Sequence, residues 1–409
     1  MKARKPLLLA AAASAGQLVL LSSAFAQDWT QTPAPHCFWQ GVASSADGTK
    51  LVAAAYMADT NYNPGWLFVS TNSGLTWRQT SAPNQFWERV ASSSDGTKLV
   101  AIALADASWN PGGIYTSSDS GTTWIRTSAP RQSWYGVSSS ADGTKLAGLG
   151  WGGLIYFSTD SGQTWTAANA SQQYWKSIAC SANGIRLVAA GAALSNANFG
   201  RIYLSSDAGA NWIPASAPTN NWFSVSSSTD GSHLVAAAST GAIFTSADFG
   251  QTWVSTTAPS FEWLSVASSA EGTKLTAVAG GPAPGPIYIS SDAGKNWNQA
   301  GALQGYWTSA ACATDGNKMI AVEGGYAPGN IYTLQLLPPS PTLKIAFSAG
   351  HVRLSWPADG ANFILQQNSD LGSATTWQDV TDFVSVVEGE NQLILPGTSA
   401  KAFYRLRSQ

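Results

Sequence analysis

One sequence motif is repeated seven times along this chain. Each copy opens with Trp, passes two variable residues to an apolar residue that is usually Val or Ile, and continues through small residues to a turn of the Asp-Gly type and an apolar strand. A repeat of 41 to 48 residues with two turn signals in each unit predicts an array of small sheets. The repeated tryptophans are Trp39, Trp87, Trp134, Trp175, Trp222, Trp263 and Trp307.

Each unit contains four strand-like runs. In the second copy we expect strands at 87–93, 98–103, 113–117 and 124–127. The turn Asp95-Gly96 is a strong hairpin signal between the first two of these strands. The copies differ in length mainly in the loop between the second and third strands, which we call the variable loop. Four antiparallel strands per unit predict an all-β chain with a seven-bladed β-propeller.

The two ends of the array complement each other. The seventh unit runs through 331–333 and lacks a fourth strand, whereas residues 28–35 repeat the pattern of residues 76–83. We therefore expect the strand that contains Trp29 to complete the last blade. This closure would remove the exposed edges that an open array presents.

The N-terminus has the features of an export signal. Lys2, Arg4 and Lys5 precede an apolar stretch at 7–21, and Ala24-Phe25-Ala26 is a small-x-small cleavage site. We expect residues 1–26 to be removed and the protein to be secreted or periplasmic. No other segment approaches the length needed to span a bilayer, so no membrane span is expected after removal. The mature chain would keep 18 of the 21 basic residues against 23 acidic ones, a net charge of −5.

The composition changes after the repeats. Residues 337–341 are a Pro-rich linker, and residues 342–409 contain short alternating segments typical of a small β-sandwich. With Ser355-Trp356-Pro357 and the ending 403–407, this part resembles the short fibronectin-like C-terminal modules of secreted bacterial proteins. The propeller is thus expected over residues 27–336, between the signal peptide and this module.

Charge, cysteine and histidine content exclude several kinds of site. Charged residues make up 11% of the chain and the net charge is −2, so there is no basic footprint for nucleic acid. The three cysteines are an odd number and imply no disulfide framework. The three histidines are His36, His233 and His351, too far apart in the sequence to suggest a metal site. We expect neither a metal nor another cofactor.

A second phrase, Ser-x-Asp-x-Gly-x-Thr-Trp, follows the third strand in six units. It resembles the Asp-box, or bacterial neuraminidase repeat, which implies a β-propeller with the boxes on the face away from the ligand. Within a box, Asp can accept hydrogen bonds from the turn's own amides and Gly can adopt the left-handed backbone. The residues expected to have this structural role are Asn72, Asp119, Asp160, Asp207, Asp248 and Asp292.

The resemblance does not select a function. Asp-box propellers include sialidases, xyloglucan-degrading glycosidases, sortilin-type receptors and a photosystem II assembly factor. Sialidases bind the substrate carboxylate with three arginines and carry a Phe/Tyr-Arg-Ile-Pro motif. The nearest sequence here is 199–203, which lacks the proline, and the arginine triad is not supported.

Few carboxylates remain for catalysis. Of the 17 in the propeller, five belong to boxes and six to the turns after the first strands, which leaves six others. A glycosidase needs two carboxylates that face each other across the substrate. The weak catalytic candidates are Glu88, Glu262 and Glu323, and nothing in their spacing pairs them.

Ligand-binding candidates come from residues that do not repeat. The repeated tryptophans are expected to pack between blades, whereas aromatic and polar residues in or near the variable loops suit sugar rings or peptide segments. The candidates are Asp59, Trp66, Arg89, Asp106, Trp109, Trp151, Asn196, Arg201 and Tyr326.

The sequence favours an exported, non-catalytic, monomeric propeller. We expect it to bind an extracytoplasmic glycan or protein through the face that carries the variable loops. One alternative is an Asp-box glycoside hydrolase, exo-sialidase-like or of another specificity. A second alternative is an assembly factor similar to the photosystem II stability factor.

Overall fold

Every regular element of the described chain is a β-strand, which confirms the all-β prediction. The computed structural model describes residues 11–12, 29–192, 200–336, 343–348, 351–358, 363–368, 377–380, 384–396 and 403–408. Contacts divide the protein into one unit of Gln27–Leu336 and a second of Met1–Ala26 with Leu337–Gln409. Within the described residues, no helix has the length and apolar character to cross a membrane.

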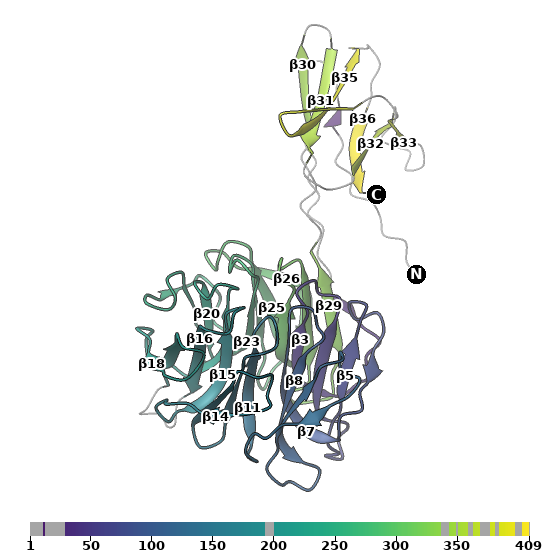
Figure 1. Ribbon diagram of the computed structural model, residues 1–409. Helices are drawn as coiled ribbons and strands as arrows, with labels where there is room; N and C mark the ends of the chain where they lie inside the picture. Colours follow the sequence, from purple (N-terminus) through teal and green to yellow (C-terminus); the bar gives the residue numbers. More distant parts are fainter. Residues whose placement is uncertain are drawn as a thin grey trace. The chain divides into compact units, whose positions relative to one another are not determined.

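Seven four-stranded antiparallel sheets are formed by the described residues between 29 and 336 (Figure 1). Sheet 1 consists of β3 (Phe38–Ser44), β4 (Leu51–Met57), β5 (Leu67–Ser70) and β6 (Arg78–Gln79). Sheet 2 consists of β7 (Gln85–Ser92), β8 (Leu99–Asp106), β9 (Ile114–Ser117) and β10 (Ile125–Arg126). Sheet 3 consists of β11 (Trp134–Ser139), β12 (Leu146–Gly150), β13 (Leu154–Ser158) and β14 (Thr166–Ala167).

The remaining sheets of this unit follow the same order. Sheet 4 consists of β15 (Tyr174–Cys180), β16 (Leu187–Ala192), β17 (Ile202–Ser205) and β18 (Ile213–Pro214). Sheet 5 consists of β19 (Trp222–Ser227), β20 (Leu234–Ala238), β21 (Ile243–Ser246) and β22 (Val254–Ser255). Sheet 6 consists of β23 (Trp263–Ser268), β24 (Leu275–Ala279), β25 (Gly285–Ser290) and β26 (Asn298–Gly305). Sheet 7 consists of β27 (Trp307–Cys312), β28 (Lys318–Glu323), β29 (Ile331–Gln335) and β2 (Thr30–Gln31).

Sheet 7 joins the two ends of the unit. Thr30 of β2 lies opposite Thr333 of β29, and the adjacent Trp29 is buried in the cluster that contains Trp307. The first strand of each sheet contacts the first strand of the next, and β27 of sheet 7 contacts β3 of sheet 1. Figure 1 shows β29 in green and β3 in purple on these neighbouring sheets.

A circuit of backbone hydrogen bonds links the turns after the first strands. Each amide nitrogen in the circuit donates to a carbonyl oxygen in the next sheet, and the seventh bond returns to the first residue. Ala46 donates to Ser94 at 2.8 Å, and Thr314 donates back to Ala46 at 2.7 Å. The intervening bonds are Ser94 to Ala141, Ala141 to Ala182, Ala182 to Thr229, Thr229 to Ala270 and Ala270 to Thr314. These turns are therefore tied to each other independently of the sheets' own ladders.

The repeated tryptophans fill the spaces between sheets, as their repetition predicts. All seven are buried, and Trp87 of sheet 2 packs on Val52, Ala54 and Leu67 of sheet 1. The core strands are rich in alanine and valine because each second strand has a sheet on both sides. Burial of each indole ring stabilises the fold by about 2–3 kcal/mol in proportion to its apolar area.

The second unit has two four-stranded sheets. One contains β30 (Lys344–Ser348), β31 (His351–Pro357), β35 (Glu390–Pro396) and β34 (Ser385–Val387). The other contains β1 (Ala11–Ala12), β36 (Phe403–Ser408), β32 (Phe363–Asn368) and β33 (Gln378–Asp379). Leu354, Trp356, Leu365 and Leu393 form its core. Apart from 11–12, the expected signal peptide and the linker 337–341 lie outside the described residues.

Candidate ligand-binding face

The polar side chains of the Asp-box turns are engaged in hydrogen bonds within the turns themselves. In the box of sheet 5, Asp248 accepts from the Ser246 hydroxyl at 2.8 Å and the Thr252 amide at 2.8 Å, and the Ser246 hydroxyl also receives the Gly250 amide at 2.9 Å. The side-chain and backbone bonds from Thr252 hold the pKa of Asp248 below its ordinary value. Each box carboxylate is thus a turn constituent, and these side chains offer no convergent site.

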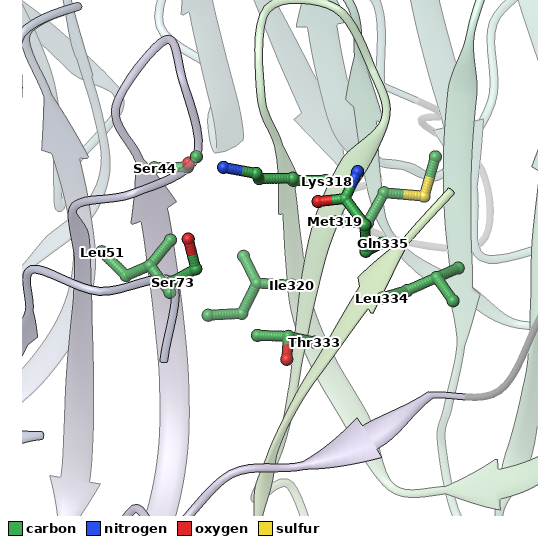
Figure 2. A pocket seen from close by; sticks show the side chains of 10 residues that line it. Ser44, Leu51, Ser73, Lys318, Met319, Ile320, Thr333, Leu334 and Gln335 are labelled. Carbon is green, nitrogen blue, oxygen red and sulfur yellow. The ribbon is translucent and has the colours of Figure 1, made fainter. Parts of the chain in front are cut away.

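The turns between first and second strands have the same character. Ser45 donates to Asp47 at 2.6 Å, and this bond, with those from the Thr49 amide and hydroxyl, lowers the pKa of Asp47 to about 2. Figure 2 shows a cavity at this end of the unit, between sheets 7 and 1, with Lys318 and Ile320 opposite Ser44 and Leu51. Its volume is about 70 Å³, and similar gaps separate other sheet pairs. Because the gaps recur with the repeat, they are packing features of the scaffold.

The opposite end of each first strand contains a β-bulge. In sheet 3, Trp134 pairs with Gly150 and Gly136 with Leu149, so Tyr135 between them has no partner in register. All seven sheets show this irregularity immediately after the repeated Trp. Bulges re-aim side chains and are enriched beside functional sites. The bulged residues are Gln40, Glu88, Tyr135, Lys176, Phe223, Leu264 and Thr308.

Several bulged residues come together across sheets. Glu88 of sheet 2 interacts electrostatically with Lys176 of sheet 4 and Tyr135 of sheet 3. Burial raises the pKa of Glu88, while Arg89, Gln40 and Lys176 act in the opposite direction. Burial lowers the pKa of Lys176, which Glu88 opposes. The first strands therefore meet around a desolvated group of unlike charges.

Aromatic rings surround these charges. The Lys176 ammonium lies 4.7 Å from the centroid of the Tyr174 ring and 5.3 Å from that of Phe223. Tyr135 and Tyr174 each contact the exposed Trp151, with ring centroids 5.8 Å and 5.9 Å away. Burial, with smaller contributions from Tyr174 and Glu88, raises the pKa of Tyr135 to about 12, so its hydroxyl remains a hydrogen-bond donor. We call Glu88, Tyr135, Tyr174, Lys176 and Phe223 the central cluster.

Arg89 adjoins the central cluster through its contacts with Glu88. Its Nη1 atom donates to the carbonyl oxygens of Gln40 at 2.8 Å and Glu88 at 2.9 Å, and lies 3.4 Å from Glu88 Oε2. Sheets 4 to 7 have serine in this position, and Ser177 accepts a hydrogen bond from the amide of Val225 in the next sheet at 3.1 Å. Ser177 thus links neighbouring sheets, and Arg89 does the same with a longer, charged side chain, whereas sheets 1 and 3 have glycine in this position.

Three predicted carboxylates anchor variable loops. Asp59 accepts from the Asn61 amide and the Asn63 side chain, both at 2.8 Å. Asp106 accepts from the Ser108 amide at 2.9 Å and lies 3.9 Å from Arg131. Glu323 accepts from the Asn330 amide at 3.3 Å. Their oxygens stabilise the loops, and they do not gather into one site.

The other predicted residues are dispersed. Trp109, Trp151 and Tyr326 are exposed, whereas Trp66 is half-buried and packs on the cluster that contains Trp39. Glu262 and Arg201 are exposed and directly precede β23 and β17, respectively. Asn196 lies outside the described residues.

Sequence reasoning missed Lys176, Tyr135 and Tyr174 as site residues. All three are adjacent to repeated tryptophans, and none of them is among the candidate residues that the sequence predicts. For Tyr135 and Lys176 the signal is the lack of repetition at the position directly after the repeated Trp, where the seven units have seven different residues. Tyr174 lies directly before Trp175, outside that position. Within the described part of the chain, no three His, Cys, Asp or Glu side chains come close enough to hold a metal ion.

Comparisons with known proteins agree with a propeller-like fold. The BNR-Asp box repeat family matches residues 243–256, which comprise β21, the box turn and β22. No curated protein matches the chain. Among solved structures, YCF48 from Cyanidioschyzon merolae is 16% identical with a TM-score of 0.55, over 75% of this chain and 98% of that one.

Two further structures are similar to this chain. A structure of YCF48 bound to D1 peptide is 14% identical with a TM-score of 0.56, over 78% of this chain and 99% of that one. The GH74 xyloglucanase from Xanthomonas campestris is 15% identical with a TM-score of 0.56, over 81% of this chain and 59% of the enzyme. At such identities the similarity shows the fold alone, and these proteins differ in function.

Proposed function

We propose that this chain is an exported, non-catalytic, seven-bladed β-propeller that binds a glycan or protein ligand through its variable-loop face. The pairing of β2 with β29 and the hydrogen-bond circuit through Ala46 and Thr314 support closure of the ring by the N-terminal strand. The basic and apolar features of residues 1–26 support export. The C-terminal unit would be an accessory or anchoring module.

The main support for this proposal comes from the seven bulged residues, one directly after each repeated Trp. Columns with a scaffold role repeat their residue, as the buried tryptophans and the serines of the boxes do. The bulged residues occupy equivalent places yet differ in charge, size and polarity from sheet to sheet. If the bulged residues only packed against the repeated residues of the adjacent sheet, the same side chain would be favoured in every sheet. Their variety therefore supports a role in recognising a ligand that lacks the sevenfold repeat.

The rival function, glycoside hydrolysis, has one supporting observation. Burial raises the pKa of Glu88, a property suited to a general acid. The charged groups that act on Glu88 are the cations Arg89 and Lys176, and Asp59, Asp106 and Glu323 are engaged in their own loops. A second carboxylate opposite Glu88 is needed for this reaction. The assembly-factor alternative draws on the D1 peptide bound to YCF48, which favours a protein ligand.

The test compares the central cluster with a matched surface position. A glycan array and a peptide display library are probed with the wild type and with Tyr135→Ala, Lys176→Met and Ile125→Ala. Ile125 is exposed on the outer strand β10 and serves as the control. We expect a ligand whose affinity falls at least about tenfold, or 1.4 kcal/mol, with the cluster variants and is unchanged with Ile125→Ala.

Two results would contradict the proposal. One is a ligand that binds all three variants equally, since the variable-loop face would then have no part in recognition. The other is turnover of an aryl glycoside by the wild type that Glu88→Gln abolishes, which would establish the hydrolase.

A further inference from the structure

Three variable loops share one pattern and one exposed ring. Residues 59–65, 106–112 and 323–329 each read acid, two residues, aromatic, one residue, Pro-Gly. The aromatic is Tyr62 in sheet 1, Trp109 in sheet 2 and Tyr326 in sheet 7, and these sheets are consecutive neighbours. Trp109 and Tyr326 are among the ligand-binding candidates that the sequence predicts, and Tyr62 is not.

Both ends of the pattern build the loop. The acid at its start accepts hydrogen bonds from residues near its end, as described for Asp59, Asp106 and Glu323. The glycine lets the loop return against the second strand: a β-carbon at Gly65 would lie 1.9 Å from the Ala55 carbonyl oxygen, and one at Gly112 would lie 2.1 Å from that of Ala103. The acid and the glycine are therefore required by the backbone, and the aromatic is not.

Two of the exposed aromatic residues have a strained backbone conformation. Tyr62 has φ of 61° and Trp109 has φ of 63°, in the left-handed region that bulky residues rarely adopt. Their side chains, with that of Tyr326, are 68%, 58% and 62% exposed. Strain held at an exposed apolar side chain points to a functional role, since folding gains little from it.

Neighbouring rings hold two of these side chains in place. Trp109 stacks on Phe86 with centroids 4.1 Å apart, and Tyr326 lies 5.8 Å from Tyr306. Trp151, in the variable loop of sheet 3, is 56% exposed and leans on Tyr135 and Tyr174. A ring that packs against a neighbour on one face and is exposed on the other is already held in place, so it loses little conformational entropy when a ligand stacks on it.

We propose that Tyr326, Tyr62, Trp109 and Trp151 form an arc of stacking positions for a neutral polysaccharide chain. This inference rests on the proposed binding function and names its ligand class. Flat apolar faces of sugar rings stack on aromatic rings, and a polymer presents them at intervals, as four consecutive sheets present these rings. A protein ligand would favour a clustered, desolvated patch such as the central cluster, which only Trp151 of the four rings contacts, whereas Tyr326, Tyr62 and Trp109 stand on separate loops among Asn, Asp and Gly.

The loop charges favour a neutral polymer. The acids are engaged within their loops, and Arg131 lies 3.9 Å from one of them, Asp106. An acidic polysaccharide would therefore find no array of unpaired cations along these loops.

Affinity electrophoresis of the full-length protein tests the arc. The probes are mixed-linkage β-glucan, galactomannan and xyloglucan, with polygalacturonate as an anionic probe. We expect retardation by at least one neutral polymer and none by polygalacturonate. Tyr62→Ala, Trp109→Ala, Tyr326→Ala and Trp151→Ala should each weaken that binding about tenfold, or 1.4 kcal/mol. Trp109→Tyr should retain most of it, and the exposed control Ile125→Ala should not change it.

The outcomes separate the two proposals. Because the four rings are exposed, we expect each variant to have the melting temperature of the wild type. Measuring that temperature excludes misfolding as the cause of lost binding. Retardation that survives all four substitutions, or that only polygalacturonate produces, would overturn the arc. A peptide ligand lost with Lys176→Met, without retardation by any polysaccharide, would overturn the arc while leaving the binding function in place.

Discussion

The side chain of Lys50 in sheet 1 lies against the α-carbon of Gly96 in sheet 2. A β-carbon at Gly96 would lie 2.8 Å from Lys50 Cβ and 2.7 Å from Lys50 Cδ. The same contact joins every pair of neighbouring sheets, so a cationic or imidazole side chain covers a turn glycine seven times. The other pairs are Lys98 with Gly143, Lys145 with Gly184, Arg186 with Gly231, His233 with Gly272, Lys274 with Gly316 and Lys318 with Gly48.

Substitution of Gly96 should therefore cost more than its backbone angle alone. Gly96 and Gly152 both have positive φ, but a β-carbon at Gly152 would have no atom within 4 Å. We expect Gly152→Ala to lower the free energy of unfolding by about 1 kcal/mol and Gly96→Ala by about 3 kcal/mol. Urea unfolding followed by tryptophan fluorescence measures both. Equal losses would show that Lys50 moves aside freely.

The boxes should tolerate asparagine better than alanine. Asn72 already accepts from Ser70 at 3.0 Å and from the Thr76 amide at 2.9 Å, which reproduces the bonds of the aspartates. We expect Asp248→Asn to leave the unfolding free energy nearly unchanged and Asp248→Ala to lower it by about 1 kcal/mol, because the Thr252 amide loses its acceptor. A larger loss for Asn than for Ala would contradict this account.

Acid should weaken the turns before it weakens the sheets. Hydrogen bonds from Ser45, Ser93 and Ser228 are the largest cause that lowers the pKa of Asp47, Asp95 and Asp230 to about 2. Because these values lie below the ordinary carboxyl pKa, the stabilisation is present above about pH 4 and is lost as the pH falls toward 2.

Denaturant titrations at pH 7, 4, 3 and 2 measure that loss. Asp95→Asn, which keeps the acceptor without a titratable group, should show a shallower decline than the wild type. An unfolding free energy that is flat from pH 4 to pH 2 would contradict the assignment.

The proposed export makes a prediction about the N-terminus. Peptidase cleavage after Ala26 would give a mature chain that begins with Gln27 and has a net charge of −5. Intact-mass measurement of the protein recovered from the periplasm or medium tests this. A chain that retains Lys2, Arg4 and Lys5 there would contradict cleavage, and it would keep the pairing of Ala11 with Tyr404.

The strands were predictable because their signals are local and repeated. The strand expected at 87–93 corresponds to β7, and the turn Asp95-Gly96 separates β7 from β8. The similarity of residues 28–35 to 76–83 anticipated the pairing of β2 with β29. Each of these features follows from alternation, turn residues or internal similarity, which a single sequence contains.

The central cluster was not predictable by the same means. Lys176 and Glu88 are far apart in the sequence, and each lies at the bulge of its first strand, where their charges interact across sheets. A bulge leaves no local pattern when its residue differs in every copy. The acids Asp59 and Asp106 were placed near the correct loops, but their role as loop anchors depends on hydrogen bonds that composition does not reveal.

The two-residue strand β2 also governs when this unit can be finished. During synthesis, sheets 1 to 6 each find all four strands within one continuous stretch of chain. Sheet 7 needs Thr30–Gln31, which precede sheets 1 to 6 in the chain, together with β29, which follows them. A nascent chain that stops before Ile331 would carry an unmatched edge at each end of the array. These unpaired edges would be open to association with other chains even though most of the sheets were already complete.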